Sequence, residues 1–381
     1  MTRLDLGSSE RVSDVVLPRR LGYLPQLDGL RAVAIGMVML FHLLPLRAPG
    51  GWIGVDIFFV LSGFLITSLL LDERVMTGRV RYGRFVLRRF FRLYPGLVAL
   101  LIGATIWAEI VGIPHWGTVV SWTVEVRRNI VDMSQNSNLL KDNVLGPTWT
   151  LAMEDQFYVV WPIVLIVASR FMSRRGIAGL AAAGALASLL VKCALYGNGV
   201  AVRRLIFGPD CTAGLLLIGC VAGLLFVNRD LDRLRGGVLT RFAPPCVMAL
   251  LGVAFVLAQE TDRWLYVGPT TVLALASAVL IVGVVLAPTT WFARLLSWGP
   301  LVLVGKWSYS LYLWHTLAYF IVSNSVARGR AGFVGVAEKL GLAFALGITS
   351  YYLIERPVRN LGRSVLARSR QEVVATVMSA D

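Results

Sequence analysis

The sequence has few charged residues, few histidines and few cysteines. Charged residues make up 15% of the 381 positions and hydrophobic residues 56%, whereas roughly 25% of a soluble domain is charged. The three histidines are too few for a histidine-rich metal site, and the four cysteines follow no zinc-binding spacing. We therefore expect neither an ordinary soluble protein nor a metal site, and we expect the cysteines to pack as small apolar residues.

Long polar linkers are also absent, because apolar runs recur along nearly the whole chain. Runs of about 18–22 apolar residues are typical of transmembrane helices. We predict an all-α fold, a polytopic helical membrane bundle of about ten transmembrane helices in a single domain. The expected spans lie near residues 29–46, 52–70, 93–113, 148–168, 177–195, 208–227, 243–258, 264–286, 301–322 and 334–354.

The basic residues give this bundle a direction. A net charge of +15 would suggest nucleic-acid binding in a soluble protein, but cytoplasmic loops of membrane proteins also collect Arg and Lys. Most basic residues fall in cytoplasmic segments if the N-terminus lies inside, which predicts that both termini are cytoplasmic. We expect cytoplasmic tails at 1–22 and 361–381 around one membrane domain at 23–360, without a cleavable signal peptide.

The cell type follows from an association. All but four of the basic residues are arginine, a bias that is common in GC-rich bacteria such as the actinobacteria. We therefore expect a multi-pass protein of a bacterial cytoplasmic (inner) membrane.

Two ionisable residues lie within the first expected span. Arg31 and His42 are 11 positions apart, so they return to within roughly 20° of one helix face and differ in height by about 16 Å. A histidine deep in an apolar run needs a partner and is a candidate functional group. Asp56, one turn into the second span, could accept a hydrogen bond from His42 and fix its tautomer. The alternatives are a snorkelling Arg31 and a hydrogen-bonded packing role for His42.

The segment 72–95 is the most basic part of the chain. Its arginines at 81, 84, 88 and 92 share one helical face, which predicts an amphipathic helix at the cytoplasmic surface that ends at Pro95. Guanidinium groups there could bind anionic lipids or hold the phosphates of a ligand, and the residues leave both possibilities open.

Two later regions carry further candidates. The external loop at 114–147 could cover a site or bind a polar acceptor. Glu154 opens the fourth span, where the helix dipole stabilises a carboxylate or where it adds a second carboxylate at the depth of His42. In the ninth span Ser308, Tyr312 and His315 share a face that could line a cavity or form interhelical hydrogen bonds.

The region from 177 to 286 is expected to be scaffold. Its spans are mainly Ala, Leu, Val and Gly, and we assign no role to its notable charges, Lys192 and Asp210.

Six short segments stand out because they follow one fixed order along residues 24–360. They are Arg31 with His42, then 54–65 (GVDIFFVLSGFL), 85–95 (FVLRRFFRLYP), 149–158 (WTLAMEDQFY), 308–315 (SYSLYLWH) and 355–357 (ERP). In this set and order the chain resembles the acyltransferase-3 family of integral membrane acyltransferases. The resemblance implies a ten-helix enzyme that transfers an acyl group, usually acetyl, from cytoplasmic acyl-CoA to a hydroxyl of an extracytoplasmic sugar, glycolipid or polysaccharide.

Members of this family differ in acceptor and in domain content. Some acylate macrolide antibiotics, and others carry a C-terminal extracytoplasmic hydrolase-like domain. Because this chain stops after the tenth span, we expect the stand-alone type. Acylation of a macrolide-type metabolite is the alternative within the family. Outside it, the alternatives are a glycolipid transporter or flippase, which the lack of an internal repeat disfavours, and a non-catalytic scaffold, which the His42 stripe disfavours.

The pattern and the resemblance together predict a route for the donor. Acyl-CoA would be a co-substrate rather than a permanently bound cofactor, and its flexible arm would thread between helices past Arg31 towards His42. The residues expected to hold its phosphates and arm are Arg31, Arg84, Arg88, Arg89 and Arg92.

The predicted chemistry centres on His42 as general base on the acceptor hydroxyl. Asp56 would orient the imidazole, and Glu154 would bind the acceptor or support the same network. Tyr312 and His315 are expected to bind substrate, and Arg31 or Tyr312 is a candidate oxyanion donor.

Overall fold

The protein is helical throughout the part of the chain that its computed structural model describes, which is residues 22–111, 145–259, 262–324 and 332–366. The predicted N-terminal tail and most of the loop predicted at 114–147 lie outside the described residues.

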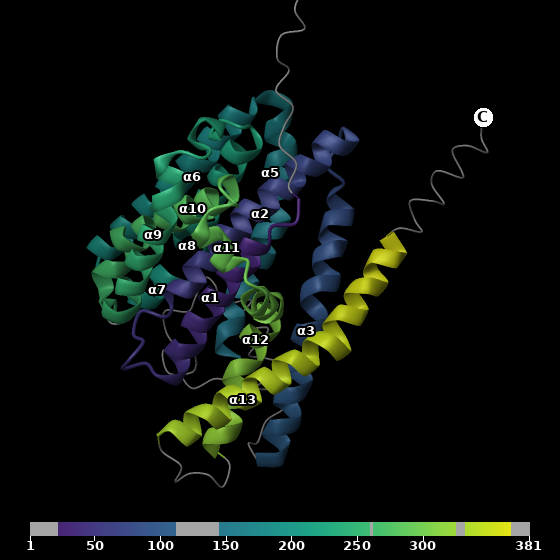
Figure 1. The fold of residues 1–381 in the computed structure, drawn as a ribbon, viewed down its shortest axis with the longest axis vertical. Coiled ribbons are helices and arrows are strands. Elements are labelled where there is room, and N and C mark those ends of the chain that lie inside the picture. Colours follow the sequence, from purple (N-terminus) through teal and green to yellow (C-terminus); the bar gives the residue numbers. More distant parts are fainter. Residues whose placement is uncertain (1–21, 112–144, 260–261, 325–331, 367–381) are drawn as a thin grey trace, which may run out of the picture.

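Long helices dominate the fold (Figure 1). They are α1 (Pro25–Leu43), α2 (Ile53–Thr77), α3 (Tyr82–Val111), α5 (Trp149–Phe171), α6 (Arg174–Gly197), α8 (Pro209–Val227), α9 (Val238–Leu257), α10 (Gly268–Leu286), α12 (Gly299–Asn324) and α13 (Phe333–Ser350). Shorter elements join them, namely η1 (Gly146–Thr148), α7 (Val202–Phe207), η2 (Asp232–Leu234), η3 (Arg263–Tyr266), α11 (Trp291–Leu296) and the π-turn η4 (Tyr351–Glu355).

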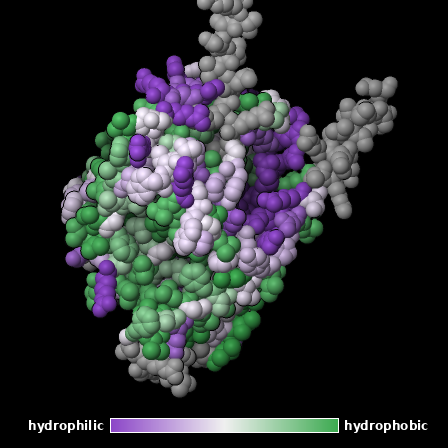
Figure 2. All heavy atoms as spheres, viewed as in Figure 1, coloured by the Kyte–Doolittle hydropathy of each residue, from purple (hydrophilic) through white to green (hydrophobic). Residues whose placement is uncertain are grey.

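The predicted polytopic bundle is confirmed. Nine helices of the described residues are long and apolar enough to cross a membrane. The one expected span outside these nine is the ninth, α12, whose 26 residues reach about 39 Å but whose Ser, Tyr, Trp and His side chains lower its hydropathy. Figure 2 shows hydrophobic side chains over most of one face, with hydrophilic ones gathered at the upper end and beside α3. The assignment of both termini to the cytoplasm stays a prediction.

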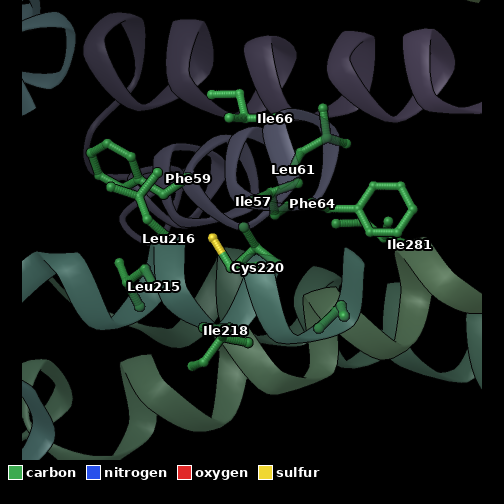
Figure 3. Packing of buried hydrophobic residues seen from close by; sticks show 14 of the residues in the cluster. Ile57, Phe59, Leu61, Phe64, Ile66, Leu215, Leu216, Ile218, Cys220 and Ile281 are labelled. Atoms are coloured by element: carbon green, nitrogen blue, oxygen red, sulfur yellow. The ribbon is translucent and has the colours of Figure 1, made fainter. Parts of the chain in front are cut away.

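The centre of the bundle is the contact between α2 and α8. Phe59 and Phe64 on α2 are buried against Leu216 and its neighbours on α8 (Figure 3). Backbones meet here, because a Cβ built at Gly219 would lie 2.0 Å from the carbonyl oxygen of Val60. Close approach at small residues is a main source of helix association in membranes.

This contact predicts the first mutational outcome. Gly219→Val places a side chain against the α2 backbone, and such overpacking costs about 1–3 kcal/mol or more. We expect a lower thermal midpoint and little folded protein after detergent extraction, as measured by size-exclusion chromatography. Gly252→Ala on α9 is the control, because a Cβ at that glycine meets nothing within 4 Å. Equal yields of the two variants would contradict the prediction.

A second backbone contact joins α1 to the C-terminal helices. A Cβ at Gly305 of α12 would lie 1.8 Å from the carbonyl oxygen of Asp28. α3 and α13 in turn pack against α12, away from the α2 and α8 pair (Figure 1). The helix pair α1 and α12 therefore lies between α2 and α8 on one side and α3 and α13 on the other.

The prediction that the basic helix ends at Pro95 is wrong, because α3 continues through this proline to Val111. Proline removes one helical hydrogen bond, but neighbouring helices in a membrane protein can hold the backbone around it. Here the hydroxyl of Tyr309 on α12 donates to the carbonyl of Leu93. The amphipathic segment and the third span are thus a single helix.

The last span also continues past a proline. The π-turn η4 directly precedes Pro357, and the helix runs on to Leu366. A π-turn changes the local hydrogen-bond register, so the missing N–H of a following proline is accommodated.

Candidate active site

Two histidines from distant parts of the sequence lie side by side between α1 and α12. The rings of His42 and His315 have centroids 5.0 Å apart, and Nε2 of His315 lies 3.3 Å from Nδ1 of His42. His315 is completely buried, whereas His42 is exposed and lines a cavity. The sequence predicted a functional face on each helix but not this pairing.

Backbone carbonyls set the tautomers of both neutral rings. Nδ1 of His42 lies 2.9 Å from the backbone carbonyl oxygen of Val38. Nδ1 of His315 lies 2.8 Å from the backbone carbonyl oxygen of Tyr312. A carbonyl can only accept, so both Nδ1 atoms carry the proton. The Nδ1–H of His42 is then shared with Nε2 of His315. Nε2 of His42 keeps a free lone pair, which is the state that a general base requires.

The histidine cavity is the space of about 890 Å³ that His42 lines. Residues of α1, α2, α6, α7, α12 and α13 contribute to its wall, among them Asp56, Lys192 and Tyr312. Asp56 is buried with its Oδ2 unpartnered. Among the described residues, the hydrogen-bond partners of the His42 ring are Val38 and His315. Asp56 therefore shares the cavity with His42, but the predicted hydrogen bond between them is not formed.

The arginine cavity is a smaller space of about 80 Å³ at the other end of the Arg31–His42 stripe. Its lining includes Arg31, Arg89, Arg92 and Glu154. The Glu154 carboxylate accepts hydrogen bonds of 2.7 Å from the hydroxyls of Ser62 and Tyr158. Glu154 was expected at the depth of the histidine, but it lines the arginine cavity instead.

The remaining arginines predicted to hold phosphates point elsewhere. Arg84 donates to the carbonyl of Leu366 at 3.2 Å, and Arg88 pairs with Glu73 at 3.0 Å. Arg89 instead stacks over the Tyr158 ring, with its Cζ 5.0 Å from the centroid. Of the five predicted donor ligands, Arg31, Arg89 and Arg92 converge on one cavity.

Comparisons with known proteins identify the family of the chain. Residues 24–354 match the family model described as "Acyltransferase domain". The chain belongs to this acyltransferase family. It is 33% identical over 365 residues to the "Putative peptidoglycan O-acetyltransferase YrhL" of Bacillus subtilis, which covers 89% of this chain and 55% of the relative. It is 29% identical over 398 residues to the "O-acetyltransferase OatA" of Staphylococcus aureus strain MRSA252, which covers 98% of this chain and 64% of the relative.

The acyltransferase chain thus spans 55 to 64% of the length of these two relatives. No solved structure matches it.

Three side chains of the acyltransferase domain border both cavities. Tyr312 lines each of them, together with Val55 and Phe59. Its hydroxyl donates to the carbonyl of Pro147 at 2.8 Å and accepts from Thr150 at 2.9 Å. These bonds fix Tyr312 as part of the wall between the cavities. The predicted polar face of α12 is thereby divided, because Ser308 lines the arginine cavity and His315 supports His42.

Sequence reasoning missed several residues of the acyltransferase site. Tyr158 lies four positions after Glu154 on the same helix face, so helical spacing alone could have found it. Lys192 was given no role, yet it is buried and lines the histidine cavity. Arg203, which the sequence analysis did not single out, lines the same cavity. Its charge within an apolar span marks Lys192 locally, whereas no local pattern marks Arg203. The cavity that both line depends on how α6 and α7 pack.

Proposed function

We propose that this chain is a membrane O-acyltransferase of the bacterial cytoplasmic membrane. It moves an acyl group, most simply acetyl, from acyl-CoA to a hydroxyl of an extracytoplasmic carbohydrate. The name of the Bacillus subtilis relative favours peptidoglycan as the acceptor. The observation that carries the proposal is one stripe on α1 that joins two unlike cavities, an arginine-lined one at Arg31 and a histidine-lined one at His42.

The arginine cavity suits the donor. Arg31, Arg89 and Arg92 present guanidinium groups, which match phosphate geometry. A volume of about 80 Å³ is too small for a nucleotide but admits a narrow chain. The nucleotide would bind at the mouth, and the pantetheine arm would extend past Arg31 towards Tyr312. Displacement of the Tyr312 side chain would open the way to the histidine cavity.

The histidine cavity suits the acceptor. Nε2 of His42 takes the proton of the acceptor hydroxyl as its oxygen attacks the thioester carbonyl. The carbon–sulfur bond then breaks, the sulfur of CoA leaves and takes up the proton, and an ester remains on the acceptor. His315 holds the tautomer of His42, which is a positioning role. In this scheme Glu154 serves the donor side, and Tyr312 would act as oxyanion donor after its hydroxyl leaves the carbonyl of Pro147.

Reconstituted protein tests the proposal directly. Proteoliposomes that contain the full chain receive radiolabelled acetyl-CoA and a peptidoglycan-type glycan acceptor. We expect ester-linked label on the glycan and one free CoA thiol released for each label transferred. Movement of a pre-acetylated glycolipid across the membrane, without any new label, would overturn the enzyme and identify a transporter. Label transfer that is equal in protein-free liposomes would also overturn it.

A further inference from the structure

The charges that line the histidine cavity are unbalanced. Among the described residues of its wall, Lys192, Arg203 and Lys339 are cationic and Asp56 is the single acid. Uncompensated charge at membrane depth is costly and usually marks a ligand pathway. The cavity of about 890 Å³ also has room for a ligand that would balance the charge.

Lys192 is the least expected of these cations. It is 4% exposed on α6, a helix made otherwise of Ala, Leu and Gly over most of its length. No hydrogen bond or ion pair within 4.0 Å joins it to another described residue, and Asp56, across the cavity, acts on it only at longer range. A buried ammonium group without a direct partner is retained only if something else solvates it.

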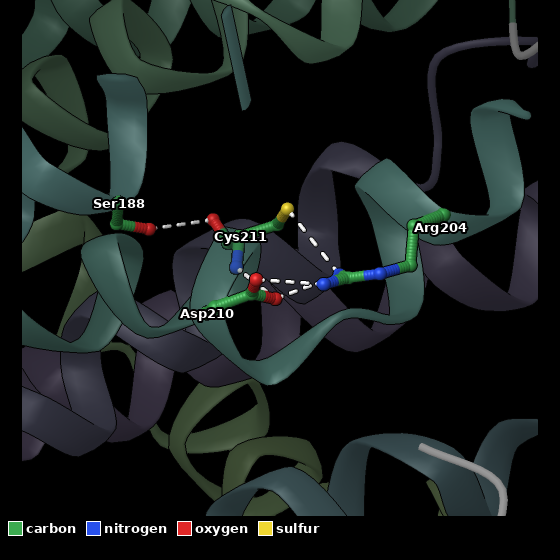
Figure 4. A network of polar contacts seen from close by, with 4 residues as sticks. All are labelled: Ser188, Arg204, Asp210 and Cys211. Carbon is green, nitrogen blue, oxygen red and sulfur yellow. Dashed lines mark hydrogen bonds and ion pairs between the residues drawn. The ribbon is translucent and has the colours of Figure 1, made fainter. Parts of the chain in front are cut away.

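Arg203 supplies a second unpartnered donor in the same wall. Its Nη1 atom is buried without a hydrogen-bond partner. The short helix α7 that carries it is held firmly, because the next residue, Arg204, forms two 2.7 Å hydrogen bonds with Asp210 at the start of α8 (Figure 4). The carbonyl of Cys211 in turn accepts from Ser188 of α6 at 2.8 Å. The hydrogen bonds between Arg204 and Asp210 and between Ser188 and Cys211 therefore hold α7 between α6 and α8, next to the helix that carries Lys192.

We propose that Lys192 and Arg203 form an anion subsite for the acceptor. Both residues line the cavity that His42 also lines, so an acceptor could place a carboxylate or phosphate against these cations and a hydroxyl at Nε2 of His42. The enzyme would then select a carbohydrate that carries negative charge over its neutral analogue. This inference rests on the proposed acyl transfer and adds the chemical class of the acceptor.

The test compares a matched pair of acceptors, a carboxylate and its neutral carboxamide, with a phosphate-bearing sugar. Wild-type proteoliposomes with labelled acetyl-CoA receive N-acetylmuramic acid, its neutral carboxamide, or N-acetylglucosamine 1-phosphate. We expect kcat/KM for the carboxylate to exceed that for the carboxamide at least about tenfold, because hydrogen bonds to charged groups contribute that much. Preference for the phosphate over the carboxylate would assign the subsite to phosphate, and equal rates with all three would overturn the subsite.

Two variants locate the preference. Lys192→Met keeps the length of the side chain without its charge, and Arg203→Gln removes a cation that makes no contact with Asp56. In each variant the ratio of kcat/KM for the carboxylate to kcat/KM for the carboxamide should be close to one. Lys306→Met on α12, whose lysine lines neither cavity, is the matched control and should keep the wild-type ratio. An unchanged ratio in both cavity variants would overturn the assignment.

A binding readout separates this inference from the proposed reaction. Trp52 and Trp149 line the same cavity, so tryptophan fluorescence should respond to N-acetylmuramic acid in wild type. The apparent Kd should rise at least about tenfold in Lys192→Met. Binding with this dependence but no label transfer would refute the acyltransferase and keep the anion subsite. Label transfer without any charge preference would keep the acyltransferase and refute the anion subsite.

Discussion

Replacement of His42 by alanine is expected to reduce acyl transfer by about 10²–10⁴-fold, the usual contribution of a general base. The reason is geometric, because Nε2 of this ring is the lone pair left free towards the cavity once Nδ1 is committed to Val38. The proposed function places the donor in the other cavity, so donor binding should change little. Initial rates of labelled acetyl transfer, with acetyl-CoA binding by equilibrium dialysis on the same samples, give both quantities.

Variants at His315 show whether the lower transfer rate of His42→Ala reflects the loss of a correctly held base. Its Nε2 accepts from His42 at 3.3 Å, so His315→Phe removes the acceptor and should lower the rate by about tenfold, in line with one lost hydrogen bond to a polar partner. His315→Gln offers an amide oxygen in its place and should recover part of the rate. The base assignment fails if His42→Ala keeps more than a tenth of the wild-type rate while the protein stays folded.

The sequence located the helices well because hydropathy is a local property. Runs of apolar residues mark spans wherever the partners lie, and the ten expected segments correspond to long helices, with ends that differ by several residues. The two exceptions are at Pro95 and Pro357, where a helix continues through or past a proline and, in the second case, a π-turn precedes it. A proline rule based on isolated helices does not include the support of neighbouring helices.

The site was only partly predictable because it depends on which helices meet. Periodicity showed that Arg31 and His42 share a face, and the structure places them in separate cavities along one helix. The partner of His42 is 273 positions away and is brought near by a backbone contact at Gly305. Glu154 was placed by depth alone, and depth does not decide which neighbouring helix a side chain faces.

The arginine helix shows the same limit. Its most polar stripe includes Arg84 and Arg88, and helical spacing therefore selected them together with Arg92. In the fold α3 turns Arg89 and Arg92 towards α1 and α5, while Arg88 remains on the side of Glu73. The orientation of α3 about its own axis is set by these contacts, which a single helix does not encode.

This orientation separates two adjacent arginines in function. Arg89→Ala is expected to raise KM for acetyl-CoA by roughly 10–100-fold, because a charge-assisted contact to phosphate contributes about 1.5–3 kcal/mol. Arg88→Ala should change KM by less than about twofold, since an exposed pair such as Arg88–Glu73 contributes little. The measurement is the dependence of the initial transfer rate on acetyl-CoA concentration at a fixed, saturating acceptor concentration.

The comparison also distinguishes a donor site from general attraction to anionic lipid. Arg89 and Arg88 carry equal charge one residue apart on α3, so a surface that merely attracts phosphate would lose affinity equally in both variants. A donor cavity would lose affinity for acetyl-CoA only in Arg89→Ala. Arg89→Lys adds a second discrimination, because it restores the charge but not the planar guanidinium that stacks on Tyr158. Its KM should therefore lie between wild type and Arg89→Ala, whereas an effect of charge alone would return it to the wild-type value.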